Sequence, residues 1–558
     1  MTTRNLALKN SYRDSVELMR LSQELEQMSG VQGATIIMGT DNNKAMLETA
    51  GLLTEDGKAV VITGSPDIGG SRTSMAIMAA EELGIDVNLI QPLVGDTEAN
   101  ALIIAVRLSP ADDEAAIMNR VQELLDSSGR ESEANASSNQ PRTIDGALAA
   151  LPDSNLALIS VPGQYAAYEA TKALDRGLHV LVFSDNVSIE DEVELKNHAL
   201  NQGLFMLGPD CGTAIINGVP LGFANAVPRG RVGIVAASGT GLQQVSCLLA
   251  AQGHGISQAL GVGSRDTCDQ VGGAMMLEGI RVLNDDPNTD VIVLISKPPG
   301  PMAQQQIAFA LRVVSKPSVV CFLGMDAQAP NIPNVYFEMT LHEAANRVAG
   351  LLGDPTDDTS PVLPSPEMTL LQEISDGLGR DQRYIRGLYS GGTLAYESML
   401  FLRDLNFDIS SNLDFPLVNS IDDDAERTHK LIDMGDDRFT QGVPHPMIDY
   451  RQRRERILKE ATNPEVGIIL LDVILGYGSH ADPASELVPA INEARLLASA
   501  AGRQLAFIVV ICGTSDDPQN IQKQAAELTA AGAVVEDLSG WRYDQLWGNN
   551  PVAGAAAR

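Results

Sequence analysis

Two short glycine turns carry the residues best suited to hold a small anion. Ser238-Gly239-Thr240-Gly241 follows a Val/Ile-rich run, and Ser390-Gly391-Gly392-Thr393 follows a second apolar run. After each turn the apolar residues recur at helical spacing, which predicts a helix start. A helix N-terminus offers free N–H groups and partial positive charge, glycine permits close backbone approach, and hydroxyls add donors. One such turn alone is more often an ordinary strand–helix connection, but the pair favours a phosphate-binding site.

A histidine held between two prolines is the second candidate. His445 lies between Pro444 and Pro446, with Asp449 four residues further on. An imidazole in a rigid loop next to a carboxylate can act as acid, base or substrate-positioning group. The alternative is a histidine that only structures the loop through a hydrogen bond to Asp449. The residues alone leave these two interpretations nearly even.

The elements that must position these residues are short strands alternating with helices. This alternation predicts parallel sheets with right-handed crossovers. An aromatic content of 4% fits cores rich in Val, Ile, Leu and Ala. We predict an N-terminal α/β domain (1–130, with a ferredoxin-like arrangement as one option), a linker (131–142), a Rossmann-like domain (143–230), a flavodoxin-like domain (231–350), a linker (351–383), a second flavodoxin-like domain (384–545) and a C-terminal tail (546–558).

The segments that begin at Arg231 and Tyr384 form a weak internal repeat. Each opens with a strand and a Ser-Gly turn, and the later strands of the two segments match in order and character. We therefore expect two related units that pack about an approximate two-fold axis, with the two turns facing each other.

Composition excludes several classes of partner. The formal net charge of −33 argues against nucleic acid and anionic membranes. No apolar run approaches the length of about 18 residues that spans a bilayer. The five cysteines form no CxxC pair, which is typical of free thiols in a cytoplasmic protein. We predict a cytoplasmic protein without a metal site.

Longer motifs resemble known families. GPDCGT, GRVGIVAASGTG, GISQALGVGSRD and NDDPNTDVIVLISK are similar to the α subunit of succinyl-CoA synthetase, and the segment from Tyr384 is similar to the ligase domain of its β subunit. LALISVPGQYAAYEA, FSDNVSIEDEVELK, GPDCGTAI, SKPP, GLYSGGTLAYE, MGDDRFTQGVPHPMID and LLDVILGYGSHADPA resemble the FdrA family across nearly the whole chain. The resemblance implies a CoA-binding Rossmann-like domain followed by two ligase-type domains.

The resemblance also implies an activity. FdrA proteins are subunits of an oxamate carbamoyltransferase of anaerobic allantoin catabolism, which interconverts oxalurate plus phosphate with oxamate plus carbamoyl phosphate. The implied partners are these small anions and the other subunits of a hetero-oligomeric complex. By the same resemblance, Gly208, Pro209, Asp210 and Thr213 would line a CoA- or nucleotide-like edge of the Rossmann-like domain.

Two departures from the synthetase change the expected chemistry. The segment 324–330, which corresponds to the phosphohistidine loop, contains no His, and no stretch resembles an ATP-grasp domain. Lys297 stands where the synthetase has the carboxylate that supports the phosphohistidine. We therefore predict no required cofactor, leave CoA binding open, and propose Lys297, His445 and Asp449 as catalytic residues. The alternatives are an acyl-CoA synthetase or CoA-binding protein, and a structural scaffold for catalytic partner subunits.

Overall fold

The computed structural model divides the chain into two compact units, residues 1–152 with 438–444 and residues 153–437 with 445–558. The residues described are 2–8, 31–38, 62–63, 93–94, 102–108, 141, 143–325, 330–353, 374, 377–404, 407–415, 418–420, 428–440 and 444–537. The predicted tail 546–558, most of the two predicted linkers and most of residues 1–130 lie outside these ranges.

The first unit contains a small antiparallel sheet. Its strand order is β1-β5-β2, formed by β1 (Thr2–Leu8), β5 (Leu102–Leu108) and β2 (Val31–Met38). A separate parallel pair joins β3 (Ile62–Thr63) and β4 (Leu93–Val94). Helix α5 (Ile144–Ala150) begins at Thr143, whose hydroxyl accepts a hydrogen bond from Gly146 N.

The second unit begins with a Rossmann-like βαβαβ segment. Its parallel sheet has the order β6-β7-β8, with a helix in each connection. The elements are β6 (Leu156–Ile159), α6 (Gly163–Leu174), β7 (His179–Val182), α7 (Ile189–Asn201) and β8 (Met206–Leu207). Lys196 of α7 is buried and pairs with Glu192 at 2.7 Å and with Asp266 at 2.8 Å. Because Asp266 also accepts from Met275 N, this network ties α7 to the start of the following domain.

A seven-stranded sheet follows, in the order β10-β9-β12-β11-β13-β14-β15. Its strands are β9 (Thr213–Ile216), β10 (Val219–Gly222), β11 (Arg229–Ala236), β12 (Ile256–Gly261), β13 (Val291–Ser296), β14 (Ser318–Phe322) and β15 (Val335–Phe337). Its helices are α8 (Gly239–Ala251), α9 (Ala274–Asp285), α10 (Pro301–Leu311) and α11 (Leu341–Leu352). The antiparallel β9–β10 hairpin extends this sheet, although the sequence pattern assigned these residues to the preceding domain.

The last sheet repeats this plan. It is parallel throughout, in the order β18-β17-β19-β16-β20-β21-β22. Its strands are β16 (Tyr384–Tyr389), β17 (Ile409–Ser411), β18 (Asn419–Ser420), β19 (His429–Asp433), β20 (Val466–Ile474), β21 (Ala506–Cys512) and β22 (Val534–Asp537). Its helices are α13 (Gly392–Asp404), α15 (Arg451–Ala461), α16 (Pro483–Ala500) and α17 (Ile521–Ala530), and a short helix α14 covers Asp437–Thr440.

The two seven-stranded sheets share a flavodoxin-like core. The order β12-β11-β13-β14-β15 in one sheet matches β19-β16-β20-β21-β22 in the other. In each series the strand that comes first in the chain, β11 or β16, occupies the second position. This confirms the predicted α/β fold class. Both central sheets consist of nearly continuous apolar runs because helices cover both faces.

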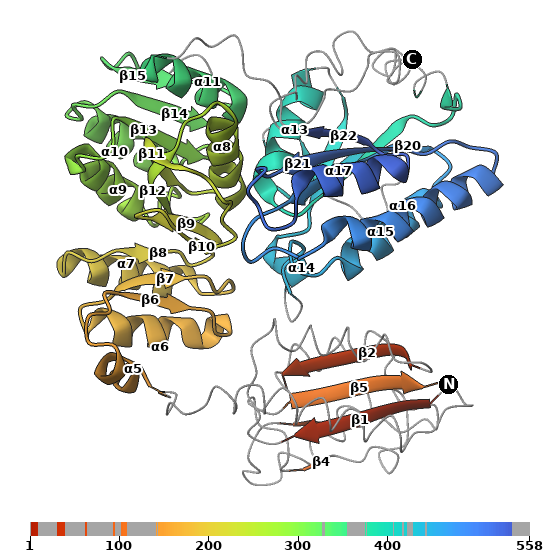
Figure 1. The fold of residues 1–558 in the computed structure, drawn as a ribbon, viewed down its shortest axis with the longest axis horizontal. Coiled ribbons are helices and arrows are strands. Elements are labelled where there is room, and N and C mark those ends of the chain that lie inside the picture. Colours follow the sequence, from red (N-terminus) through yellow and green to blue (C-terminus); the bar gives the residue numbers. More distant parts are fainter. Residues whose placement is uncertain are drawn as a thin grey trace. The chain divides into compact units, whose positions relative to one another are not determined.

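Helices α8 and α13 face each other between these two sheets (Figure 1). One hydrophobic cluster contains residues of both, including Leu248 of α8 and Met399 of α13. A second junction joins the segment after β10 to the last sheet, where Asn225 Nδ2 donates to Leu475 O at 2.9 Å and to Asp517 Oδ2 at 2.8 Å. Across the described ranges, none of the helices combines the length and apolar character needed to cross a bilayer.

Candidate functional site

The two Ser-Gly turns meet where α8 and α13 begin. Ser238 ends the strand–helix turn and accepts a hydrogen bond from Gly241 N at 3.0 Å, and its hydroxyl is also hydrogen-bonded to the hydroxyl of Thr393. Both side chains are buried. A methyl group on Gly391 would lie 2.6 Å from Thr240 Cγ2, so a larger residue there would force the Thr240 side chain to move. The expectation that the two turns face each other is confirmed.

A buried ion pair holds the second turn in place. Ser390 donates to Asp472 at the end of β20, from its N–H at 2.8 Å and from its hydroxyl at 2.8 Å. Arg453 of α15 donates to the same carboxylate at 2.9 Å and to Leu388 O at 2.9 Å. Arg453 and Asp472 are both fully buried.

These contacts correct the position of the predicted anion site. The hydroxyls of Ser238 and Thr393 bond to each other, and the hydroxyl and N–H of Ser390 are used by Asp472. The hydroxyl groups expected to bind phosphate between the turns are therefore engaged with protein groups, which argues against a phosphate shared symmetrically between them. The remaining candidate is the α13 side, at Gly392.

Three titratable side chains surround Gly392 and the nearby Gly435. A methyl group on Gly392 would lie 2.5 Å from Asp433 Oδ2 and 2.8 Å from Lys297 Nζ. A methyl group on Gly435 would lie 2.9 Å from His445 Nε2 and 3.2 Å from Asp433 Oδ1. Asp433 therefore stands between the lysine and the histidine. We call Lys297, Asp433 and His445 the polar row.

Lys297 supplies a full positive charge beside the helix start. It lies in the loop after β13 and is half-buried. Among the described residues it makes no salt bridge, although Asp433 Oδ2 lies beside the same glycine and the lysine charge lowers the pKa of that carboxyl group. An ammonium group that no described carboxylate pairs, next to the N-terminus of a 13-residue helix, favours a bound anion.

Asp433 is buried at the end of β19. Its Oδ1 accepts a hydrogen bond from Gly435 N at 2.9 Å, which fixes the carboxyl group, and no described group donates to Oδ2. Burial raises the pKa of Asp433 to about 6, against the opposing effect of Lys297. The residue is thus able to change protonation near neutral pH.

His445 is neutral over this range. Its Nδ1 accepts a hydrogen bond from Met447 N at 3.2 Å, so the neutral ring carries its proton on Nε2, which faces Gly435. Burial and the charge of Arg453 lower the pKa of His445 to about 4, and its ring packs against Phe223 at 5.2 Å between centroids. This arrangement favours a fixed hydrogen-bond donor over a proton shuttle.

Asp449 does not form the expected pair with His445. Its carboxylate accepts from Arg451 Nε at 2.8 Å and from Arg451 N at 2.9 Å, which occupies both its oxygens with the arginine. The link to the histidine is instead a backbone bond from Asp449 N to His445 O at 3.0 Å. The structure therefore corrects the sequence-based role of Asp449: it shapes the start of α15.

The four residues of the predicted CoA-like edge are split between two locations. Gly208 and Pro209 are buried in the turn after β8, and Asp210 accepts a hydrogen bond from Ser264 at 2.8 Å. Asp210 reaches solvent, and the protein around its other sides, together with the charge of Asp185, raises its pKa to about 7. Thr213 is buried and donates to Phe223 O at 3.2 Å, beside the start of α8.

Cys211 lies in the same turn, in surroundings that do not favour a thiolate. Its thiol is buried and contacts Gly261 O at 3.1 Å, and burial raises its pKa to about 12. A thiolate nucleophile needs the opposite shift.

Sequence reasoning missed Asp433. It directly precedes the motif MGDDRF, whose own Asp436 and Asp437 gave no reason to single it out. The available signal was its position at the carboxyl end of a strand in a doubly wound sheet, where ligands bind.

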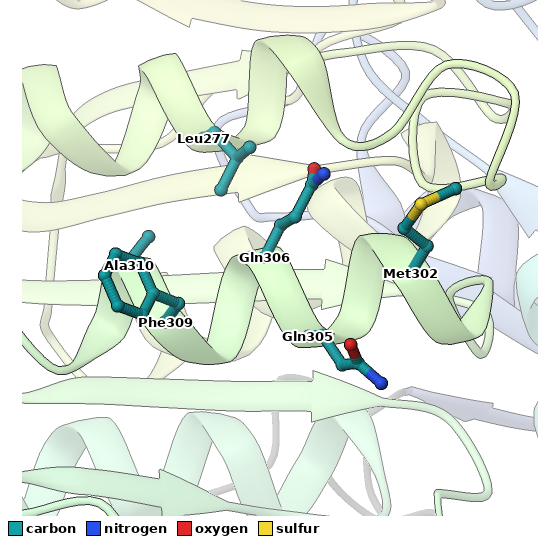
Figure 2. Close-up of a pocket in the computed structure, with 6 residues that line it drawn as sticks. All are labelled: Leu277, Met302, Gln305, Gln306, Phe309 and Ala310. Carbon is teal, nitrogen blue, oxygen red and sulfur yellow. The ribbon is translucent and has the colours of Figure 1, made fainter.

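A pocket elsewhere on this unit is a poor candidate for catalysis. It has a volume of about 590 Å³ and is lined by Leu277, Met302, Gln305, Gln306, Phe309 and Ala310 of α9 and α10. Figure 2 shows that these side chains are apolar or neutral. None can transfer a proton or hold a charge.

A comparison over nearly the full length shows the family. The uncharacterized protein YahF of Escherichia coli is 37% identical over 542 residues, which cover 97% of this chain and 97% of YahF. The chain belongs to the YahF family. Two family models match parts of it: CoA-ligase over residues 388–539, and AllF, heavy metal-associated domain, over residues 1–63.

More distant proteins resemble this YahF-family chain over shorter stretches. The α subunit of the ADP-forming succinate–CoA ligase of Aquifex aeolicus is 29% identical, over 31% of this chain and 57% of that subunit. The apo structure of dinucleotide-forming acetyl-coenzyme A synthetase 1 of Ca. Korarchaeum cryptofilum is 16% identical, with a TM-score of 0.31, over 73% of this chain and 86% of that one. The CoA-ligase match spans most of the last sheet and supports the ligase-type character predicted for it.

Proposed function

We propose that this chain is a subunit of an oxamate carbamoyltransferase, in which phosphate and carbamoyl phosphate bind at the polar row. The observation that carries the proposal is the ammonium group of Lys297 at the start of α13, which no described carboxylate pairs. The match of the N-terminal residues to a family model named for AllF and the resemblance to FdrA proteins support the same pathway.

The reaction needs little covalent chemistry from the protein. Phosphate oxygen attacks the carbamoyl carbon of oxalurate, the bond from that carbon to the amide nitrogen breaks, and oxamate leaves as carbamoyl phosphate forms. Lys297 and the N–H groups of α13 would hold the phosphate, and the Nε2 proton of His445 would bond to an oxygen of the substrate. Positioning of the substrates and stabilisation of charge would supply most of the rate enhancement.

The second candidate is an acyl-CoA synthetase, which the CoA-ligase match favours. Such enzymes of the succinyl-CoA synthetase type use a phosphohistidine, whereas residues 324–330 here contain no His. A third possibility is a scaffold that only supports catalytic partner subunits.

One set of assays separates the three. The chain is co-expressed with the products of neighbouring genes, and the complex is supplied with oxalurate and phosphate. We expect carbamoyl phosphate to form, and we expect labelled ATP with CoA and succinate to leave no acid-labile label on the chain. Retained label with thioester formation would establish the ligase instead. Transferase activity with a phosphate KM that the loss of Lys297 leaves unchanged would assign this chain to the scaffold role.

The position of the anion gives a matched pair of glycine variants. Gly392→Ala should lower phosphate affinity about tenfold, because the new methyl group displaces Lys297 Nζ and occupies the anion's place. Gly239→Ala is the control at the corresponding first position of α8, where the nearest atom is Thr213 Oγ1 at 3.3 Å. It should bind phosphate like the wild type in calorimetric titration. Equal losses in both variants would contradict binding on the α13 side alone.

A further inference from the structure

The polar row contains one group that can exchange a proton with the substrate while being held in place. We infer that Asp433 is the general acid–base residue of the proposed carbamoyl transfer, exchanging a proton with the amide nitrogen of oxamate. The inference rests on the proposed function and adds to it a catalytic residue that sequence analysis did not identify.

Geometry selects Asp433 over its neighbours. Its Oδ1 is fixed by Gly435 N, which leaves Oδ2 directed at the space beside Gly392 where Lys297 also points. In the transition state the phosphate oxygen and the amide nitrogen are both bound to the carbamoyl carbon. The amide nitrogen must therefore lie within a few ångströms of the phosphate that Lys297 holds. A carboxyl oxygen at this place reaches that nitrogen, as general acid–base catalysis requires.

The other two members of the polar row are unsuited to this step. Lys297 is needed as a cation to hold phosphate. His445 has its Nδ1 occupied by Met447 N and is neutral, with a pKa of about 4, so it offers a hydrogen bond and no basic nitrogen toward Asp433. The next carboxylate, Asp472, is saturated by Ser390 and Arg453.

The step balances with Asp433 alone. In the synthetic direction the amide nitrogen of oxamate attacks the carbon of carbamoyl phosphate, the nitrogen–carbon bond forms, and the bond from carbon to the phosphate oxygen breaks. The ionised Asp433 takes the proton that the nitrogen loses and returns it to the departing phosphate. In the reverse direction the protonated Asp433 gives its proton to the leaving nitrogen and recovers it from the attacking hydrogen phosphate.

The charges around Asp433 place its titration near neutrality. Burial raises its pKa to about 6, Lys297 and the hydrogen bond from Gly435 oppose this, and Asp436 and Asp472 add to the rise. Asp210 of the Rossmann-like segment acts from a further element. The synthetic rate should therefore fall as pH drops through about 6, because the base becomes protonated. The reverse rate should fall as pH rises above it.

The decisive experiment compares kcat, phosphate affinity and pH profile in the assembled complex. Asp433→Asn should lower kcat in both directions by about 10²- to 10⁴-fold and remove the pH dependence near 6. It should leave phosphate affinity unchanged or tighter, since a negative charge beside the anion is lost. Asp433→Glu should retain part of the activity and the pH dependence, because it keeps the carboxylate.

Asp436→Asn is the matched control, since it removes a neighbouring carboxylate from the same loop. It should keep kcat within about threefold of the wild type and retain the pH dependence. An active complex in which Asp433→Asn keeps its kcat and pH profile would overturn this inference and leave the proposed function standing. A wild-type complex without transferase activity would overturn both.

Discussion

Replacing Arg453 by Met should destabilise the second unit by about 3–5 kcal/mol, because it leaves the carboxylate of Asp472 buried without its cation. Both side chains are fully buried, and Arg453 also holds Leu388 O at the end of β16. Ser390 donates hydrogen bonds to the same carboxylate, so loss of the arginine should disturb the start of α13. Urea unfolding of the second unit measures the change in its free energy of unfolding.

Arg454→Met is the control for this variant. Arg454 is the next residue of α15 and pairs with Glu486 at 2.7 Å, but its side chain is 43% exposed. Exposed pairs contribute about 0–1 kcal/mol, so this variant should unfold almost like the wild type. If both variants shifted the urea midpoint equally, the buried pair would not have the structural role assigned to it.

The penalty of Arg453→Met should also depend on pH in a defined direction. Burial already raises the pKa of Asp472 above its ordinary value, and removing the arginine raises it further. A group whose pKa is higher in the folded state stabilises the fold at low pH and loses that contribution as pH rises. The variant should therefore lie closer to wild-type stability at about pH 5 than at pH 7. A penalty independent of pH would contradict the assignment to Asp472.

Replacing Lys297 by Ala should weaken the binding of phosphate or carbamoyl phosphate about ten- to a hundredfold without unfolding the protein. Losing a charge-assisted hydrogen bond to a bound anion costs about 1.5–3 kcal/mol. The fold should tolerate the change, because Lys297 is half-buried and makes no salt bridge with a described residue. Calorimetric titration of phosphate into the assembled complex, wild type against variant, is the measurement.

Lys172→Ala controls for the loss of one positive charge from a strongly acidic chain. Lys172 lies on α6 in an exposed pair with Glu169, and at ordinary ionic strength its charge is screened beyond about 10 Å. This variant should bind phosphate like the wild type. Equal affinities of Lys297→Ala and the wild type would mean that the glycine turns only connect strands to helices and that any anion binds elsewhere.

Lys297→Ala and Asp433→Asn should affect different kinetic quantities, phosphate affinity in the first variant and kcat in the second. Lys297→Ala removes the charge that holds the anion and should raise the phosphate dissociation constant, whereas Asp433→Asn should lower kcat without weakening phosphate. Two neighbouring residues with opposite patterns would locate binding and proton transfer at one place in the fold.

Sequence alone determined the features that depend on near neighbours. Strand–turn–helix patterns at Arg231 and Tyr384 placed β11 with α8 and β16 with α13, because hydrophobic periodicity and glycine turns act over a few residues. The same local pattern indicated that the two modules are related and singled out the Ser-Gly turns, whereas Lys297 was singled out only by the resemblance to succinyl-CoA synthetase.

Tertiary structure alone decided which of these side chains meet. Ser238 and Thr393 are 155 residues apart and Ser390 and Asp472 are 82 apart, so no local pattern could show that these contacts occupy the groups expected to bind phosphate. Periodicity specifies which face of an element is buried, whereas a side chain's partner depends on how distant elements pack against one another. That packing moved the candidate anion site from the space between the turns to Gly392, and placed Asp433 between Lys297 and His445.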